Sequence, residues 1–445
     1  MSRPFLVAFP PVLFPLVLFP PVLFLLTLFA APVGQAQEET DAPTSRPVFD
    51  ASYDVGLVPS EKSARVSIRL GSGSEAVEWI RFYFDPLRHR SIEADGELVE
   101  HEGTLEWRPP KGGGTLRYVF SIDHQRDESA YDARCTTSWA IFRGEELVPR
   151  SRIRTSPIAR SRSRMRLRLP EGWSAAIPYP RFVGGAYGLD DPDTRFDRPK
   201  GWFAFGNLGV VRETIEGTRI TIAGPAGQGV RRMDALALLR WTLPSIAELF
   251  GALPERFNLV IAGDPMWRGG LSGPRSAYLH ADRPLISENG TSPLLHEMVH
   301  SLMRARAGKD GDWVVEGLAE YYSIALLRRS ETLSATRFES ELAAIEERAE
   351  KGGDLQASHV DGATQAKAVV VLREIERAIR EATGGARSLD DVVRALTATR
   401  EAITTEGFRQ AVTEVAGRDL EEIFERHFDE TARGTHGVPG RDAPS

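Results

Sequence analysis

Residues 292–322 read SPLLHEMVHSLMRARAGKDGDWVVEGLAEYY and contain two segments with helical spacing, joined by a short polar stretch. Thr291 and Ser292 are good N-terminal caps, and Pro293 suits a first helical position. The first helix should therefore begin just before His296. A short connection between two helices is typical of an antiparallel pair, which would bring the start of the second helix back toward the first.

The first of these helices carries the pentad His-Glu-Met-Val-His at residues 296–300. Residues four apart share one helix face, so His296 and His300 can reach the same metal ion, with Glu297 projecting beside it. Two histidines on an amphipathic helix can also be ordinary core or surface residues. A hydrolytic zinc site needs a third protein ligand and an open fourth position, so the pentad requires a partner elsewhere in the chain.

The third ligand is expected on the second helix. Arg306 occupies the position six residues after His300 where a third histidine would otherwise be found. Glu316 lies near the start of the second helix, and Glu320 follows one turn later on the same face. Glu316 is the natural third ligand, although it could simply complement the helix dipole. Glu320 is either an acceptor that orients an imidazole N–H or a plain exposed glutamate.

These residues predict a zinc site with His296, His300 and Glu316 as metal ligands and Zn²⁺ as the cofactor. Glu297 is the predicted general base, which would activate a water on the metal for attack on a peptide carbonyl. We therefore expect an exported zinc-dependent metallopeptidase that acts on a peptide or protein substrate. The adjacent pair Tyr321 and Tyr322 is assigned to core packing rather than to catalysis.

The combination of HExxH with WxxEGxxxYY resembles the gluzincin clan, and within it the glycyl-aminopeptidase family, which is related to the aminopeptidase N group. Downstream, LREIERAIREATGGARSLDDVVRAL is similar to that family's helical C-terminal region, and RYVFSIDH upstream is similar to its β-domain. The resemblance implies a β-rich N-terminal domain, a thermolysin-like catalytic domain and a helical C-terminal domain.

The chain departs from that family at two positions. The family usually has a glutamate in a Gly-Leu-Glu-His-like loop that grips the substrate's free amine, whereas the corresponding stretch here contains Ser272. The family's oxyanion-stabilising tyrosine is replaced by Gln365. Loss of one oxyanion donor costs about 100-fold to 1000-fold in turnover. Candidate substitutes by position are His359, Tyr278 and His280.

These departures leave a second function open. A catalytically weakened or inactive zinc-binding envelope protein, which binds peptides or partners, would also keep the metal ligands and lose the substrate-gripping groups. Strict aminopeptidase specificity, the choice between endopeptidase and exopeptidase action, and the oligomeric state do not follow from the sequence.

The N-terminal 36 residues predict a signal peptide. Arg3 precedes a long apolar run broken by prolines, and small residues follow around Gly34 to Ala36. The run is long enough for an uncleaved anchor, but its prolines favour cleavage. We expect a bacterial periplasmic or secreted protein that contacts a membrane only if this segment is retained. Cys135 is the single cysteine, so no intramolecular disulfide can form, and it is expected to be a packed apolar residue.

The overall pattern predicts an α+β multidomain fold. Short alternating runs such as ARVSIRL, EWIRFYF and TRITIAG predict antiparallel strands, and a helical pattern dominates from Ser292 onward. Between them we expect a helix over 231–250 with a kink at Pro244, a buried strand over 257–263, and a possible edge strand over Ser276 to His280. The predicted limits are signal peptide 1–36, linker 37–46, antiparallel β-rich domain 47–228, thermolysin-like domain 229–330, helical domain 331–432 and flexible tail 433–445.

The arginines between residues 160 and 168 recur at every second position, which on a strand places them on one face. This face is either an ordinary solvated surface or a patch that docks on an anionic partner. The net charge is −7, and aromatic residues that could stack on bases are not interleaved with these arginines. Nucleic acid is therefore excluded as a partner.

Overall fold

The computed structural model describes three stretches of the chain, residues 47–191, 194–357 and 359–428. The predicted signal peptide, the linker and the whole of the predicted tail lie outside these residues. Among the helices within them, none combines the length and the apolar character needed to cross a bilayer.

The first part of the described chain forms three sheets. The strand β1 (Val48–Val58) shows why: every second side chain is buried, as a strand with one face on a core requires. It lies inside a six-stranded sheet of order β14-β12-β1-β2-β7-β4. Its other members are β2 Ser63–Leu70, β4 His89–Ala94, β7 Thr115–Ser121, β12 Arg160–Arg168 and β14 Tyr187–Leu189.

One pairing in this sheet corrects the sequence expectation of purely antiparallel strands. β1 and β12 run parallel, with Val48 opposite Arg160 and Gly56 opposite Arg168. Parallel neighbours need a long crossover connection, and the strands that lie between β1 and β12 in the sequence supply it. A periodicity of two predicts a strand but carries no information about its direction.

Two smaller sheets complete the β-rich region. The first has the order β13-β15-β10-β9-β8, with bounds β8 His124–Gln125, β9 Tyr131–Cys135, β10 Trp139–Arg143, β13 Ser174–Ala176 and β15 Trp202–Gly206. The second has the order β11-β3-β6-β5, with bounds β3 Val77–Phe82, β5 Glu97–His101, β6 Thr104–Arg108 and β11 Ser151–Thr155. The short helix α1 (Gly144–Leu147) follows β10. Cys135 is fully buried, as expected for a packed residue.

A further five-stranded sheet, β16-β17-β18-β20-β19, positions the predicted metal site. Its strands are β16 Leu208–Ile215, β17 Thr218–Pro225, β18 Arg256–Ala262, β19 Gly270–Gly273 and β20 Ser276–His280. The prediction of Ser276 to His280 as an edge strand is wrong, because β19 pairs with its outer side and forms the edge instead. A glycine-rich stretch has little strand propensity, so its pairing could not be anticipated. Residue 228 is the predicted boundary between the β-rich and thermolysin-like domains, and this sheet contains strands from both sides of it. The domain limits stay predictions.

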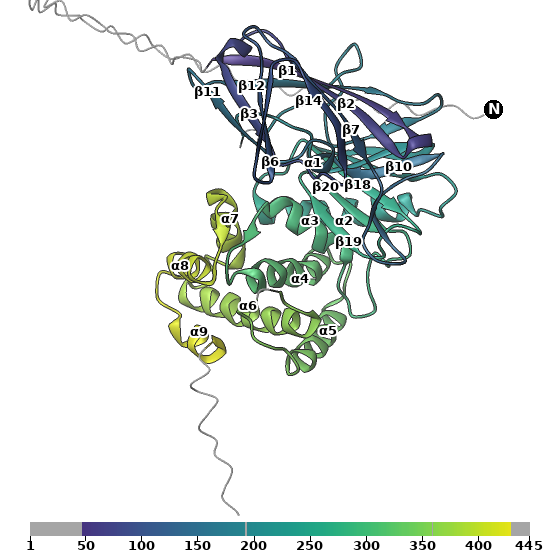
Figure 1. The fold of residues 1–445 in the computed structure, drawn as a ribbon. Coiled ribbons are helices and arrows are strands. Elements are labelled where there is room, and N and C mark those ends of the chain that lie inside the picture. Colours follow the sequence, from purple (N-terminus) through teal and green to yellow (C-terminus); the bar gives the residue numbers. More distant parts are fainter. Residues whose placement is uncertain (1–46, 192–193, 358, 429–445) are drawn as a thin grey trace, which may run out of the picture. The chain divides into compact units, whose positions relative to one another are not determined.

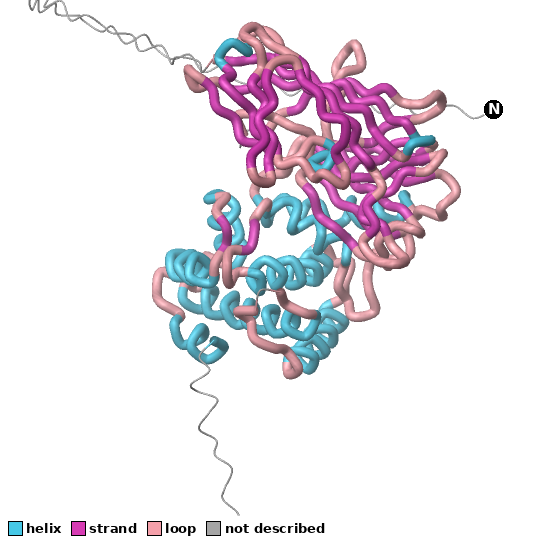
Figure 2. Tube along the Cα trace, viewed as in Figure 1, coloured by secondary structure: helices cyan, strands magenta, loops and turns pink. Residues whose placement is uncertain are grey.

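The rest of the chain is helical, so the mixed α+β character is confirmed (Figures 1 and 2). The helices are α2 Arg232–Phe250, α3 Pro293–Met303, α4 Asp312–Arg329, α5 Ala335–Ala349, α6 Gly362–Ala382, α7 Leu389–Thr399, α8 Thr405–Ala416 and α9 Glu421–Phe428. The two-residue strands β21 (Arg306–Ala307) and β22 (Ala402–Ile403) pair with each other. One apolar core joins α2, α3 and α4 to one face of the five-stranded sheet and to the later helices.

The arginines of β12 are partly compensated by the neighbouring strand. Arg162 forms an ion pair with Asp50, at 2.7 Å, and Arg168 lies 3.7 Å from Asp54. Both aspartates belong to β1, which pairs with β12 residue by residue. This arrangement is that of a charge-paired, solvated strand surface.

Close packing of α4 against α6 depends on Gly317. A Cβ at this position would lie 2.7 Å from the Cβ of Ala368, which is too close without a shift of the helices, and 3.1 Å from Cδ1 of Leu372, which would also have to move. Gly317→Ala should therefore lower the free energy of unfolding by about 1–3 kcal/mol, the usual cost of overpacking. Urea unfolding followed by circular dichroism measures the change.

Gly362→Ala is the matched control, since a Cβ there meets nothing within 4 Å at the start of α6. This variant should be neutral or slightly more stable because alanine restricts the unfolded chain. Equal stability of the two variants would contradict the close packing of α4 on α6.

Candidate metal centre

The helix α3 holds the two histidines in one direction. Ser292 caps its N-terminus, with its hydroxyl oxygen accepting from the Leu295 N–H at 3.3 Å, and Pro293 is the first helical residue, both as predicted. The four-residue spacing then places the Nε2 atoms of His296 and His300 3.0 Å apart. Their side chains are mostly buried, with exposed fractions of 16% and 13%.

The helix α4 brings a carboxylate to the same point. Glu316 Oε2 lies 3.4 Å from His296 Nε2, and Glu316 Oε1 lies 3.4 Å from His300 Nε2. One ligand atom from each of the three residues falls within 4.8 Å of the others, an arrangement that could hold a metal ion. The antiparallel packing of α3 and α4 thus brings together the three residues that the sequence predicts as ligands.

The donor set and its spacing fit a tetrahedral zinc ion. Zinc–nitrogen and zinc–oxygen bonds of about 2.0–2.2 Å at tetrahedral angles separate the ligand atoms by about 3.3 Å. The distances of 3.0, 3.4 and 3.4 Å between the three ligand atoms are close to this value. Two imidazoles and one carboxylate also leave a fourth position for a water or a substrate oxygen, as in hydrolytic sites.

Glu320 lies behind His296 on the same face of α4 as Glu316. Its Oε2 atom is 3.3 Å from Nδ1 of His296, the ring nitrogen opposite the one that faces Glu316. A carboxylate at this distance fixes the tautomer and the orientation of the ring. Of the two sequence interpretations, this contact favours the orienting acceptor over a plain exposed glutamate.

The charges in the site are strongly coupled. Burial acts to lower the pKa of His296, but the hydrogen bonds to Glu316 and Glu320 and the charge of Glu297 outweigh burial and raise it to about 10. Burial acts to raise the pKa of Glu316, but its contacts with the two histidines bring it well below its usual range. Without a metal, the site therefore carries a proton on His296 and an ionised Glu316.

Glu297 lies between the histidines and the edge strand β19. Burial is the largest influence on its carboxyl group and raises its pKa, with the charge of Glu316 acting the same way and the two histidines in the opposite direction. The backbone N–H of Ser272 donates to the carboxylate. A Cβ at Gly270 would lie 2.8 Å from Glu297 Oε1, so the glycine allows the strand to approach this closely.

The strand β19 is also tied to α3 by its last residue. The hydroxyl of Ser301 donates to the carbonyl of Gly273 at 2.7 Å. In the sequence, Ser272 stands only where a glutamate was expected, and its backbone contact with Glu297 leaves no residue pattern. Ser301 directly follows the pentad, and nothing in the sequence pattern indicates its hydrogen bond to Gly273.

The side chain of Gln365, on α6, contacts one of the three candidate metal ligands. Its side-chain amide donates to Glu316 Oε2 at 3.1 Å, a contact between residues 49 positions apart in the sequence. Among the described residues, no hydrogen bond or ion pair joins the three proposed substitutes for the missing tyrosine to the candidate ligands. The Tyr278 hydroxyl donates to the carbonyl of Trp267 at 2.8 Å, His280 is fully buried in the sheet, and His359 is exposed.

The tyrosine pair of α4 packs in the core, as predicted. Both side chains are buried, and the Tyr322 hydroxyl donates to Asp390 at 2.8 Å. Arg329 binds the same carboxylate through two nitrogens at 2.7 Å each. These contacts fasten α4 to the start of α7 and so support the helix that carries Glu316.

The similarity of this chain to known proteins is found in the fold and not in the sequence. No family model and no curated protein matches the sequence. Among solved structures, the chain is similar to an aminopeptidase N family protein from Idiomarina loihiensis, with a TM-score of 0.66, 16% identity and coverage of 85% of this chain and 76% of that one.

It is also similar to an M1 zinc metallopeptidase from Deinococcus radiodurans, with a TM-score of 0.55, 16% identity and coverage of 90% and 96%. A variant of that protein bound to a Tyr-Ser-Ala substrate gives a TM-score of 0.56 and coverage of 85% and 93%. The chain therefore has the fold of these metallopeptidases. The predicted resemblance to the aminopeptidase N group is confirmed at the level of the fold.

Metal binding should release a proton, because a zinc ligand must be unprotonated and the pKa of His296 in the metal-free protein is about 10. Zinc affinity should accordingly rise with pH throughout the range below that value. Calorimetric titration at neutral pH in two buffers with different ionisation enthalpies measures the number of protons released, for which we expect about one per zinc.

Glu347→Gln is a suitable control, since Glu347 is exposed on α5 and the charge change is the same as for a ligand variant. It should leave zinc affinity unchanged, whereas Glu316→Gln should weaken it at least about 10-fold. Binding heats that do not depend on the buffer would contradict the protonated state of His296.

Proposed function

We propose that the protein is an exported zinc-dependent metallopeptidase with His296, His300 and Glu316 as metal ligands. The observation that carries the proposal is the convergence of three ligand atoms beside a half-buried carboxylate that is not itself a ligand. A purely structural zinc site is closed by four protein ligands and needs no adjacent base. The residues 229–330 form a thermolysin-like catalytic domain in this proposal.

The zinc ion would supply Lewis acidity, which lowers the pKa of a water and polarises a peptide carbonyl. Glu297 takes the proton from the attacking water and transfers it to the leaving amine. Its buried position suits this task because a raised pKa makes the carboxylate a stronger base. The Ser272 N–H holds the carboxylate in place, and Glu320 holds the ring of His296 in its binding orientation.

The substrate is an extended peptide. The strand β19 is at the edge of its sheet and lies against Glu297, so an added peptide strand would pass the metal group. Edge strands recognise peptides by main-chain hydrogen bonds, which suits a range of sequences. The structural neighbour with a bound tripeptide supports this substrate class. The predicted signal peptide supports a periplasmic or secreted location.

A catalytically weakened or inactive peptide-binding protein is the second candidate. Ser272 brings no carboxylate to the place where a substrate amine would be gripped, and Gln365 donates to Glu316 rather than pointing freely at a substrate oxygen. Both candidates bind zinc and peptides and differ only in turnover.

Glu297→Gln should leave zinc stoichiometry intact and reduce peptide cleavage at least about 100-fold, since it removes the general base but keeps the shape of the side chain. Cleavage of a mixed peptide library, followed by mass spectrometry with and without a chelator, measures the effect. Glu347→Gln should cleave as the unmodified protein does.

Persistent hydrolysis by Glu297→Gln would refute the assigned role of Glu297. A library that stays whole with zinc-loaded protein, while peptides remain bound, would instead establish the second candidate.

A further inference from the structure

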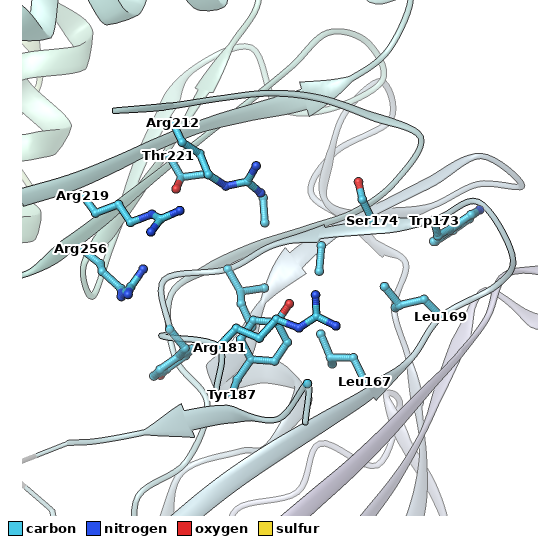
Figure 3. A pocket seen from close by; sticks show the side chains of 15 residues that line it. Leu167, Leu169, Trp173, Ser174, Arg181, Tyr187, Arg212, Arg219, Thr221 and Arg256 are labelled. Atoms are coloured by element: carbon cyan, nitrogen blue, oxygen red, sulfur yellow. The ribbon is translucent and has the colours of Figure 1, made fainter. Parts of the chain in front are cut away.

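A cavity of about 550 Å³ lies away from the metal group, between β16, β17 and β18 on one side and the segment from β12 to β14 on the other. Figure 3 shows four arginine side chains turned toward this space. They are Arg181, Arg212, Arg219 and Arg256. Within the described part of the chain, no aspartate or glutamate lines the cavity.

The register of the sheet forces three of these arginines onto one face. Arg219 on β17 is directly opposite Arg256 on β18, and Arg212 on β16 is opposite Thr221 on β17. Thr221 and Arg219 are two residues apart and so share a face. Neighbouring strands are about 4.8 Å apart, and like charges opposite each other repel, so this arrangement costs stability.

Three of the four arginines are exposed to solvent, and Arg256 is half-buried. Among the described residues, none of the four arginines forms an ion pair with a carboxylate, and the buried Nε of Arg256 has no hydrogen-bond partner. Burial and then the charge of Arg219 lower the pKa of Arg256, while Glu255 acts in the opposite direction. An arginine remains charged in a protein, so all four side chains bring positive charge to the cavity.

The wall opposite the sheet is largely apolar and aromatic. It includes Leu167, Leu169, Trp173 and the half-buried Tyr187. The Arg181 guanidinium lies over the Tyr187 ring, at 5.9 Å from its centroid. A ligand in this cavity would meet cationic groups on one side and apolar surface on the other.

We propose that this cavity is a binding site for a small organic anion that carries two or more carboxylate or phosphate groups on an apolar body. Guanidinium groups match carboxylate and phosphate oxygens in pairs of parallel hydrogen bonds, and several anionic groups are needed to neutralise four cations. The cavity volume is within the range of small-molecule sites, about 300–1,000 Å³.

The site is separate from the proposed metal centre and goes beyond the peptidase function. The side chains of Arg219 and Arg256 are on the face of the sheet opposite the one that packs against α2 and α3. The strand β20 lies between β18 and the edge strand β19 that contacts Glu297. A ligand in the cavity would not displace a peptide at β19.

Titration calorimetry with benzene-1,3,5-tricarboxylate and with 1,4-phenylene bisphosphate tests the proposal, because each carries at least two anionic groups on an apolar ring. At least one of the two should bind with one site per chain, and the tighter one identifies the anionic group that the site prefers. The neutral 1,3,5-benzenetrimethanol should not bind. The double variant Arg219→Gln/Arg256→Gln should weaken binding at least about 100-fold, about 10-fold for each lost charge-assisted contact.

The double variant Arg152→Gln/Arg166→Gln removes the same charge from two exposed strand arginines outside the cavity and should change binding less than about 2-fold. Arg219→Gln/Arg256→Gln should fold, and should be more stable than the unmodified protein without ligand, because the repulsion is relieved. Thermal unfolding with and without benzene-1,3,5-tricarboxylate verifies both points.

Carboxylates can also bind metals, so the titration is repeated on His300→Ala. Unchanged binding there supports the cavity and does not depend on the peptidase proposal. The inference is overturned if His300→Ala abolishes binding, if Arg219→Gln/Arg256→Gln binds as tightly as the unmodified protein, or if neither anion binds at millimolar concentration.

Discussion

The close approach of α4 to α3 is the constraint on which the candidate centre depends. Glu316 can face both histidines only if the second helix returns antiparallel to the first, and only if α6 allows α4 to lie near enough. Gly317 provides that space, because its missing side chain leaves room for Ala368. Tyr322 and Arg329 hold the far end of α4 on α7 through Asp390. The helix α4 is thus held by its packing on α3, α6 and α7. A set of metal ligands needs such support to keep a defined geometry.

The three candidate ligands could be selected from the sequence because the geometry that brings them together is local. Two histidines four apart share a face on any helix, and Ser292 with Pro293 determines where that helix begins. The third ligand needed only one short connection between two helices. The same reasoning predicted the mixed fold, since the change from a period of two to a helical period is visible along the chain. Strand direction and order left no such trace, so the parallel β1–β12 pair and the edge position of β19 were missed.

The environment of the centre could not be predicted, because it is made by contacts distant in sequence. Gln365 reaches Glu316 across 49 residues, and its type suggested only the loss of a tyrosine. The Ser272 contact with Glu297 uses a backbone N–H, which every residue except proline has, so no residue pattern could reveal it. These contacts decide how firmly the carboxylates are held. The Gln365 contact acts on a candidate metal ligand and so bears on metal affinity, whereas the Ser272 contact acts on the proposed base and so bears on turnover.

Two groups of arginines show how the same residue type acquires opposite meanings. Those of β12 recur with a spacing of two and attract attention in the sequence, yet Asp50 and Asp54 on the adjacent strand offset part of their charge. Arg219 and Arg256 are single residues in strands without an arginine pattern, and the sheet register places them side by side. No carboxylate among the described residues lines the cavity beside them. Like charges opposite each other on neighbouring strands repel, and a bound anion would offset this repulsion through charge-assisted hydrogen bonds. Position relative to neighbouring strands, rather than number, therefore decides whether arginines form a solvated surface or a binding site.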